Sequence, residues 1–344
     1  MNNRLRKDHQ DASSSVTIDD IAEKLGISKT TVSRAISGKG RISSETRAKV
    51  LECIQECGYR PNHIAKSLAF SKSFNIAVAV PNDAEVNEIP FFQTCLNGIA
   101  SAVGKADYDV IFSVTAPDSC SGLKRLVRNR KVDGVILTRL FANDRTVEYL
   151  KSSGIPFVVI GTSTDPDIIQ VDSNQEEGCR EMTRYLLHQG ETSIVLLAGD
   201  PQHQVNKDRH KGFCSAMEAG GYTDYEKNIY WNTSNTEDAE MLVKKLIGTE
   251  CKCIVCMDDV ICSRVLKALH KERIRVGEDI RVVSFYDSAS MEQYHPPITA
   301  LHVAVEQLSC KAGELILDTL SGKEVKKVNR VGWELRIRDS SWKK

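Results

Sequence analysis

Apolar residues recur at helical spacing in two short segments near the start of the chain. They are Ile18, Ile21, Ala22 and Leu25 in the first segment, and Val32, Ala35 and Ile36 in the second. Thr17 is placed to cap the first helix, with Asp20 completing a capping box, and Gly26 is placed to end it. Two amphipathic helices joined by so short a glycine turn predict a helix-turn-helix motif.

The second helix of such a motif enters the major groove of DNA with its first residues against the base edges. Here those residues are polar and point away from the apolar stripe. Lysine and arginine suit guanine, and threonine can contact a thymine methyl. The predicted DNA contacts in this segment are Thr17, Ser28, Lys29, Thr30, Thr31, Ser33 and Arg34. A plain pair of surface helices is the alternative interpretation of the same pattern.

A third helix is predicted over Glu45–Cys57, capped by Ser43 or Ser44 and ended by Gly58. Pro61 then suits the first position of a further helix. That helix has room for about two to three turns, and an isolated helix so short is marginal in water. We therefore expect it to form only when it is docked against something.

From residue 73 onward, short apolar strands alternate with helical stretches, which predicts βαβ units and parallel sheets. The candidate strands are Ile76–Val80, Val110–Val114, Gly134–Thr138, Phe157–Ile160, Ile194–Ala198, Cys253–Cys256, Ile280–Ser284 and Val331–Ile337. The candidate helices are Phe91–Ala106, Gln175–Gln189, Glu237–Ile247 and Cys262–Lys271. This segment is too long for one small sheet, so we expect two similar halves, with Asp165–Asp167 as the crossing between them.

The formal net charge is zero, but the charges are unevenly distributed. Residues 1–72 contain 13 Lys or Arg and 8 Asp or Glu, an excess of +5, and the rest of the chain has an excess of −5. A basic N-terminal segment on an acidic body indicates that the N-terminal segment meets a polyanion.

The overall composition, with 41% hydrophobic and 27% charged residues, is typical of a globular protein. Apolar runs stay far below the ~20 residues of a membrane span, and residues 1–15 lack the apolar core of a secretory signal. We therefore expect a cytoplasmic protein that has no membrane partner and keeps its 11 cysteines reduced. The cluster of Cys251, Cys253 and Cys256 is interpreted as small buried hydrophobes, and no metal or cofactor is expected.

The N-terminal motifs resemble those of the lac repressor/galactose repressor family of transcription regulators. The matching stretches are T-V-S-R at Thr31–Arg34, S-x-E-T-R-x-K-V at Ser43–Val50 and G-Y-x-P-N-x-x-A-x-x-L at Gly58–Leu68. The resemblance implies that the short helix is a hinge that orders on operator DNA. Its contacts would be Asn62, Ala65 and Leu68, with the leucine wedged into the minor groove so that the duplex bends.

The resemblance extends over the body to about residue 340, through stretches such as Asp133–Leu137, Arg209–Phe213 and Pro296–Thr299. It implies a body of two doubly wound subdomains, similar to periplasmic sugar-binding proteins, that close on a ligand. The predicted fold is thus an all-α helix-turn-helix headpiece joined to this α/β effector domain. The expected parts are a disordered extension (1–15), the DNA-binding domain (16–60), the hinge and linker (61–72), and the effector-binding and dimerisation domain (73–344).

The resemblance also implies which residues line the effector cleft. Arg209 matches the arginine that binds sugar hydroxyls or a carboxylate, and its planar fork of donors suits vicinal oxygens. Asp258 matches a cleft Asn or Asp and would accept from hydroxyls. Tyr286 departs from the family, which often has an acid there, but its ring could stack on an apolar sugar face. Phe91 and Phe92 are expected on the other side of the cleft. The alternative roles are a surface salt bridge for Arg209, a helix cap for Asp258 and hinge packing for Tyr286.

These features predict a homodimeric repressor of carbohydrate-utilisation genes that releases a palindromic operator in double-stranded DNA when a sugar binds. A corepressor-dependent regulator that responds to a purine or another metabolite is the alternative. A sugar-binding protein without a DNA role is disfavoured by the N-terminal motifs. An enzyme is not expected, because the sequence contains no nucleotide-binding, nucleophile-elbow or zinc-protease motif.

Overall fold

The computed structural model describes residues 16–37, 40–59, 67, 70–82, 90–116, 119–142 and 144–342. The chain divides into two compact units, Met1–Lys72 and Ser73–Lys344, which we call the head and the body.

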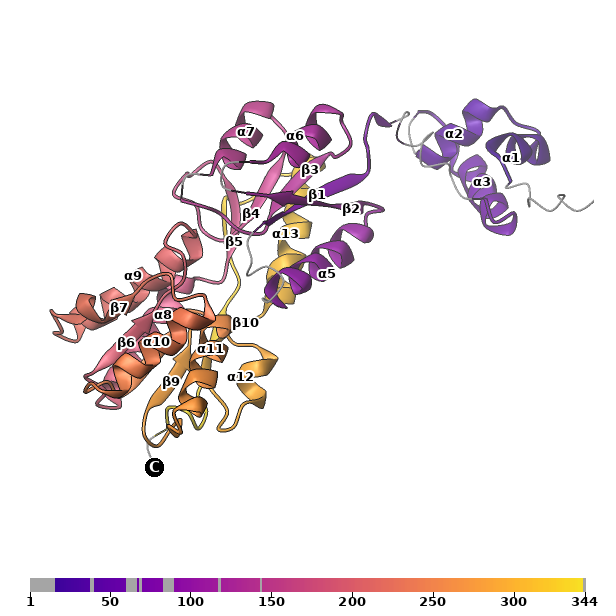
Figure 1. The fold of residues 1–344 in the computed structure, drawn as a ribbon. Coiled ribbons are helices and arrows are strands. Elements are labelled where there is room, and N and C mark those ends of the chain that lie inside the picture. Colours follow the sequence, from indigo (N-terminus) through magenta and orange to yellow (C-terminus); the bar gives the residue numbers. More distant parts are fainter. Residues whose placement is uncertain are drawn as a thin grey trace, which may run out of the picture. The chain divides into compact units, whose positions relative to one another are not determined.

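The described residues of the head form the helices α1 (Ile18–Leu25), α2 (Lys29–Ser37) and α3 (Ser44–Glu56), as the apolar pattern predicts (Figure 1). Each helix is amphipathic and turns its apolar stripe inward. The core that they share is small and consists of Ile21, Ala22, Val32, Ala35, Val50 and Cys53.

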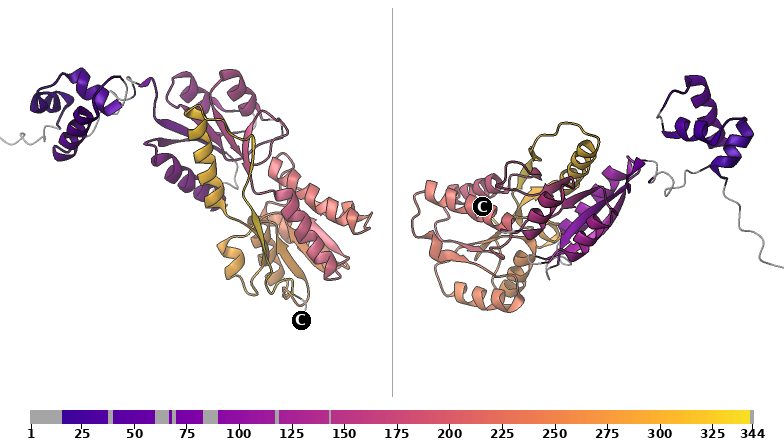
Figure 2. Two further views of the ribbon diagram at one scale, coloured as in Figure 1. Left: turned by 180° about the vertical axis from the view of Figure 1, so that it is seen from behind. Right: turned by 90° about the horizontal axis from the view of Figure 1, so that it is seen from above.

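The first lobe of the body is built on a six-stranded parallel sheet in the order β11-β5-β4-β3-β1-β2. Its strands are β1 (Asn75–Pro81), β2 (Asp109–Thr115), β3 (Gly134–Leu137), β4 (Phe157–Ile160), β5 (Ile169–Asp172) and β11 (Val328–Arg330). Helices lie on both faces of the sheet (Figures 1 and 2). They are α5 (Pro90–Gly104) and α13 (Val305–Leu320), which pack side by side, and α6 (Ser121–Arg128) and α7 (Arg145–Ser153).

The second lobe is built on a sheet in the order β12-β10-β9-β8-β6-β7, parallel except for the pairing of β10 with β12. Its strands are β6 (Ile194–Leu197), β7 (Ile229–Tyr230), β8 (Cys253–Cys256), β9 (Arg281–Ser284), β10 (Thr299–Val303) and β12 (Trp333–Arg336). Its helices are α8 (Gln175–His188), α9 (Gln204–Ala219), α10 (Thr236–Ile247), α11 (Asp259–Lys271), α12 (Ala289–Gln293) and the 3₁₀ turn Tyr225–Asn228.

The chain crosses between the lobes after β5, β10 and β11. The prediction that Asp165–Asp167 forms the crossing is therefore wrong. That segment is a turn between β4 and β5, which are neighbours in one sheet. The Asp165 side chain stabilises the turn by accepting the backbone N–H of Asp167 and by pairing with Lys151. The predicted pair of doubly wound subdomains is confirmed, and all strands and helices predicted for the body are present.

Candidate functional site

The turn of the head is held by the caps that the sequence predicts. The Thr17 hydroxyl accepts the N–H of Asp20 at 3.4 Å, and the Asp20 carboxylate accepts the N–H of Thr17 at 2.7 Å. Gly26 ends α1 in the left-handed conformation, at φ +63°. Ser28 Oγ then accepts the N–H of Thr31 at 3.1 Å and caps α2. These contacts fix the angle at which α2 leaves the turn.

Helix α2 presents a polar surface made of residues that the sequence predicts to contact DNA. Val32 and Ala35 are buried in the core of the head. Lys29, Thr30, Ser33 and Arg34 are exposed on the outer side of the same helix. Lys29 also pairs with Asp19 of α1 at 2.5 Å, so the first residue of α2 is tied to the first turn of α1. The predicted contacts Asn62, Ala65 and Leu68 lie outside the described residues.

The body contains a cleft of about 820 Å³, counted with its open mouth, where the carboxyl ends of strands from both lobes meet. Ligands of open α/β sheets bind at this end of the strands. Phe91, Phe92, Arg209, Asp258 and Tyr286 all line the cleft. The structure thus brings together the five residues predicted to bind the effector, although they are spread over almost 200 positions of the chain.

Arg209 lies on α9 with its guanidinium buried in the cleft. Its Nε donates to Gln175 Oε1 at 3.1 Å, and one terminal nitrogen donates to the carbonyl of Met257 at 2.8 Å. Both acceptors are neutral, so they orient the guanidinium without neutralising its charge. The alternative of a surface salt bridge does not fit these contacts.

Two buried carboxyl groups stand at the start of α11. Asp258 is the N-cap of this helix, since its Oδ1 accepts the N–H of Ile261 at 2.8 Å. The alternative interpretation as a helix cap is therefore correct for one oxygen of a residue that also lines the cleft. Its neighbour Asp259 lines the cleft too, and burial raises the pKa of its carboxyl group.

A third buried carboxyl group, Asp172, lies at the end of β5, where burial raises its pKa as well. The cleft therefore contains three buried acids, Asp172, Asp258 and Asp259, beside the guanidinium groups of Arg139 and Arg209. Such a lining offers many acceptors for hydroxyl donors and does not favour an anion.

Aromatic rings form one wall of the cleft. The rings of Phe91 and Tyr286 lie 6.3 Å apart and are steeply inclined, at 77°. Phe92 contacts Phe91 edge-on, and the guanidinium of Arg139 lies 4.9 Å from the Phe92 ring. Since Phe91 and Phe92 come from α5 of the first lobe and Tyr286 follows β9 of the second, this wall spans both lobes.

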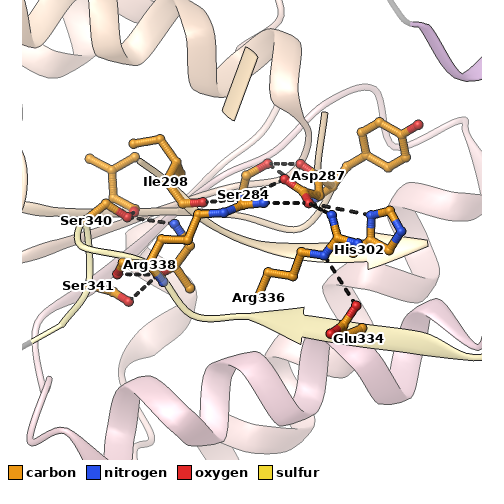
Figure 3. Close-up of polar contacts among 12 residues, drawn as sticks. Ser284, Asp287, Ile298, His302, Glu334, Arg336, Arg338, Ser340 and Ser341 are labelled. Carbon is orange, nitrogen blue, oxygen red and sulfur yellow. Dashed lines mark hydrogen bonds and ion pairs between the residues drawn. The ribbon is translucent and has the colours of Figure 1, made fainter. Parts of the chain in front are cut away.

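The segment after Tyr286 is anchored to the last strand by a buried ionic network (Figure 3). The carboxylate of Asp287 accepts two hydrogen bonds from Arg338, at 2.8 and 2.9 Å, and one from Arg336 at 3.2 Å. His302 Nδ1 lies 3.5 Å from the same carboxylate. Because Asp287 follows Tyr286 directly, the network fixes the backbone beside the aromatic wall.

The lobes also touch at the mouth of the cleft. The N–H of Ala142 donates to the carbonyl of Gln202 at 2.8 Å, and the N–H of Gln204 donates to the carbonyl of Leu140 at 3.0 Å. These bonds pair the segment after β3 with the start of α9. A motion that opens the lobes would have to break them.

Comparisons with known proteins find a family match in each of the two units. Residues 17–62 match the family described as "Bacterial regulatory proteins, lacI family", and residues 183–341 match "Periplasmic binding protein-like domain". The "HTH-type transcriptional regulator MalR" of Staphylococcus xylosus is 29% identical over 90% of this chain and 93% of its own. The chain thus joins a LacI-family helix-turn-helix domain to a periplasmic-binding-protein-like domain.

Two solved structures show the same fold as this chain. One is the "transcriptional regulator CelR-cellobiose complex", with a TM-score of 0.71, 24% identity, and coverage of 94% of this chain and 99% of that one. The other is the "lac repressor dimer bound to operator and the anti-inducer ONPF", with a TM-score of 0.79, 22% identity, and coverage of 95% and 99%. Both likenesses confirm the predicted headpiece and two-lobed body.

The regulator's cleft also contains polar residues that sequence reasoning missed. They are Thr138, Arg139, Thr162, Asp172, Ser173, Gln175, His203, Gln204, Asn206 and Asp259. Most follow a strand or begin a helix, and only their position after a predicted strand could have indicated them. In the part of the chain that the structure describes, no cluster of three metal-binding side chains occurs, and no helix is long and apolar enough to cross a membrane.

Proposed function

We propose that this regulator is a homodimeric repressor that releases a pseudo-palindromic operator when a sugar binds the cleft of the body. The observation that carries the proposal is the meeting of Phe91, Phe92, Arg209, Asp258 and Tyr286 in one cleft of a chain that also has a helix-turn-helix head. The protein would act in the cytoplasm, where the DNA is, and would catalyse no reaction.

On the DNA side, we assign base contacts to Lys29, Thr30 and Arg34, which are exposed on α2. Thr17, Ser28, Thr31 and Ser33 would hold the turn and contact the phosphates. A dimer with two-fold symmetry would place two copies of α2 in successive major grooves.

The segment that joins the head to the body is also assigned a role in DNA binding. Residues 61–72 would be a hinge between the DNA-binding domain (16–60) and the effector domain (73–344). Within it, Asn62, Ala65 and Leu68 would reach the minor groove, and the apolar leucine would stabilise a bent duplex.

On the effector side, the chemistry of the cleft favours a neutral polyol. The buried acids accept hydrogen bonds from hydroxyl groups, and the Arg209 guanidinium donates to vicinal oxygens. The wall formed by Phe91 and Tyr286 suits the apolar face of a sugar ring. The solved relative that was crystallised with cellobiose supports the same ligand class.

A flat purine fits the cleft less well. A purine would be held best between two parallel rings, whereas the rings of Phe91 and Tyr286 are inclined at 77°. We therefore rank the purine-dependent corepressor below the sugar-dependent repressor.

The sugar would act by shifting a population. It can alter operator affinity only by its differential affinity for two arrangements of the lobes, typically about 1–3 kcal/mol of coupling. If the favoured arrangement separates the two hinge segments of a dimer, the hinges lose their order and the DNA is released.

A thermal-shift screen of the full chain against mono-, di- and trisaccharides, with purines as a parallel set, tests the effector class, because a bound ligand raises the apparent stability. We expect a sugar to raise the melting temperature and to weaken binding to an operator selected from a random DNA pool. A purine that raises the melting temperature and strengthens DNA binding would instead establish the corepressor. Failure of the protein to select any sequence would overturn the proposed function.

A further inference from the structure

Two cysteines of the head lie in contact on α3. Cys53 is in the penultimate turn of the helix and Cys57 is its C-cap, and their sulfur atoms are 3.9 Å apart. Cys53 belongs to the core and is only 3% exposed, whereas Cys57 is partly exposed. The two thiols therefore differ in access to solvent although they are neighbours.

A positive charge faces the more accessible sulfur. Lys24 Nζ, at the end of α1, lies 3.3 Å from Cys57 Sγ and 3.2 Å from Glu56 Oε2. Burial raises the pKa of Cys53. Cys57 is the thiol of the pair that solvent reaches and it has an ammonium group beside it, so Cys57 is suited to react first. Cys53 lies in contact behind it and is suited to resolve the product.

We propose that Cys53 and Cys57 form a peroxide-sensitive dithiol that closes to a disulfide and weakens operator binding. In the first step the Cys57 thiolate attacks one oxygen of a hydroperoxide, the O–O bond breaks, and a sulfenic acid forms while the other oxygen leaves as water or alcohol. In the second step Cys53 attacks the Cys57 sulfur and loses its proton, and the sulfenic oxygen leaves as water. Two thiols thereby supply the two electrons that reduce one hydroperoxide.

The bond requires the end of α3 to move. Residues four apart in a helix have Cα atoms about 6 Å apart, within the range that disulfides span, but Cβ atoms about 5–6 Å apart, more than the ~4 Å that a disulfide needs. Cys57 is the residue at which α3 ends, and Gly58 follows in the left-handed conformation, at φ +61°. The last turn can therefore adjust without breaking hydrogen bonds further along the helix.

The Cys53–Cys57 pair differs in solvent exposure from a second pair of contacting thiols. Cys256 lies against Cys262 in the second lobe, but both side chains are wholly buried. A hydroperoxide in solution reaches Cys57 and does not reach that pair unless the lobe unfolds. The partly exposed Cys310, whose thiol donates to the carbonyl of Gly98 at 3.3 Å, offers a matched control in the body.

The effect on DNA follows from the small size of the head's core. Cys53 shares this core with Val32 and Ala35 of α2, the helix assigned to the bases. Closing the disulfide moves the Cys53 sulfur within the core and draws the Cys57 sulfur away from Lys24. Such repacking strains a well-packed core, so we expect operator affinity to fall roughly tenfold. This effect on DNA rests on the proposed function, whereas the oxidation does not.

The chemical step is tested on the full chain, reduced and then titrated with hydrogen peroxide. Remaining thiols are alkylated, and the peptides are mapped by mass spectrometry. We expect a Cys53–Cys57 disulfide to appear before any other cysteine is modified, to be absent in Cys57→Ser and Cys57→Ala, and to persist in Cys310→Ser. A Cys57 that accumulates as a sulfinic acid while Cys53 stays alkylatable, or an earlier reaction elsewhere, would overturn the dithiol.

The regulatory step is tested by fluorescence anisotropy, on an operator duplex that the reduced protein has selected from a random pool. Peroxide should lower the affinity of the wild type about tenfold, dithiothreitol should restore it, and Cys57→Ser should bind equally well before and after peroxide. Unchanged affinity of a wild type whose disulfide has been mapped would refute the switch. A reduced protein that selects no operator would refute the proposed function and with it the regulatory step, while the mapping still decides the chemistry.

Discussion

Contacts within the chain orient the Arg209 side chain in the cleft. The side chain is held by Gln175 Oε1 and the carbonyl of Met257, and its ring contact with Tyr286 is distant, at 6.0 Å from the guanidinium carbon to the ring centre. An arginine oriented in this way loses little conformational entropy when a ligand binds. Its contribution should therefore appear in effector affinity and not in DNA affinity.

We predict that Arg209→Ala lowers effector affinity by about 10- to 100-fold, the range expected for hydrogen bonds to a charged group. Operator affinity without effector should stay within about twofold of wild type, because the head is a separate compact unit. Isothermal titration with the sugar and anisotropy with the operator measure the two quantities. Arg184→Ala, on the exposed face of α8, is the control, and a normal effector response in Arg209→Ala would remove this residue from the site.

Asp172 illustrates how a binding cleft lowers the stability of the free protein. Because burial raises the pKa of this carboxyl group, its ionisation is less favourable in the folded chain than in the unfolded chain. Stability is therefore lost as the pH rises from the unfolded pKa through the folded one. Below both values the group is neutral in both states and has no effect.

We predict that Asp172→Asn raises the free energy of unfolding by on the order of 1 kcal/mol at pH 7 and weakens sugar binding, a common exchange at functional sites. The gain should shrink as the pH falls from 7 through the raised pKa of Asp172 toward the unfolded pKa, where the carboxyl group becomes neutral in both states. Denaturant unfolding at the two pH values measures it. The exposed Asp109→Asn should show neither effect, and an equal gain at both pH values would exclude the electrostatic cause.

At the scale of the element, the capping box at Thr17 determines where α1 begins. Replacing Thr17 by alanine removes the hydroxyl that accepts the N–H of Asp20, and such a loss costs about 1 kcal/mol. We predict faster amide hydrogen exchange across α1 in Thr17→Ala and near wild-type exchange in Thr17→Ser, measured on the full chain. If amide hydrogens of α1 exchange at the wild-type rate in both variants, then tertiary packing alone stabilises the helix.

Hydrogen bonds from Thr17 also lower the pKa of Asp20. A carboxylate with a lowered pKa stabilises the fold above its unfolded pKa and stops doing so as the pH falls through the folded value. The difference in exchange between Thr17→Ala and wild type should therefore diminish in acid.

The sequence predicts a strand well where its apolar residues follow one another without interruption. A strand that has polar residues among the apolar ones is missed. β4 reads FVVI and was found, whereas β5 reads IQVD and was missed. Gln170 in β5 is buried because its amide oxygen accepts the N–H of Ser163, a contact with no trace in local sequence. α9 was missed because only a few of its residues are apolar, and its burial depends on packing against α8.

Some residues of the cleft can be recognised from local sequence motifs, whereas others are brought to the cleft only by the tertiary fold. Family motifs indicate Arg209 and Asp258, and both line the cleft, as does Tyr286, where the sequence departs from the family. Asp172 and His203 carried no comparable signal, because they reach the cleft through strand order and lobe crossing. Such positions could not be predicted from spacing along the chain.

At the scale of the whole molecule, the head and the body differ in charge. The segment 1–72 has an excess of +5 and the segment 73–344 an excess of −5. A basic head attracts DNA phosphates, while an acidic body repels them and so limits nonspecific contact. Charge alone can thus direct the DNA to one unit of a chain whose net charge is zero.

This division predicts that operator affinity falls linearly with salt on logarithmic axes, with a slope that reflects the phosphates neutralised by the head. Deleting residues 1–72 should abolish DNA binding and leave sugar binding within about twofold, because the cleft lies entirely in the body. Anisotropy between 50 and 200 mM salt, a range over which such affinities change by orders of magnitude, and calorimetry on the truncated chain measure the two effects. Lys311→Gln, which removes a partly exposed charge from α13 of the body, should not change the slope. A slope near zero, or DNA binding that survives the deletion, would show that the charge excess of the head has no part in recognition.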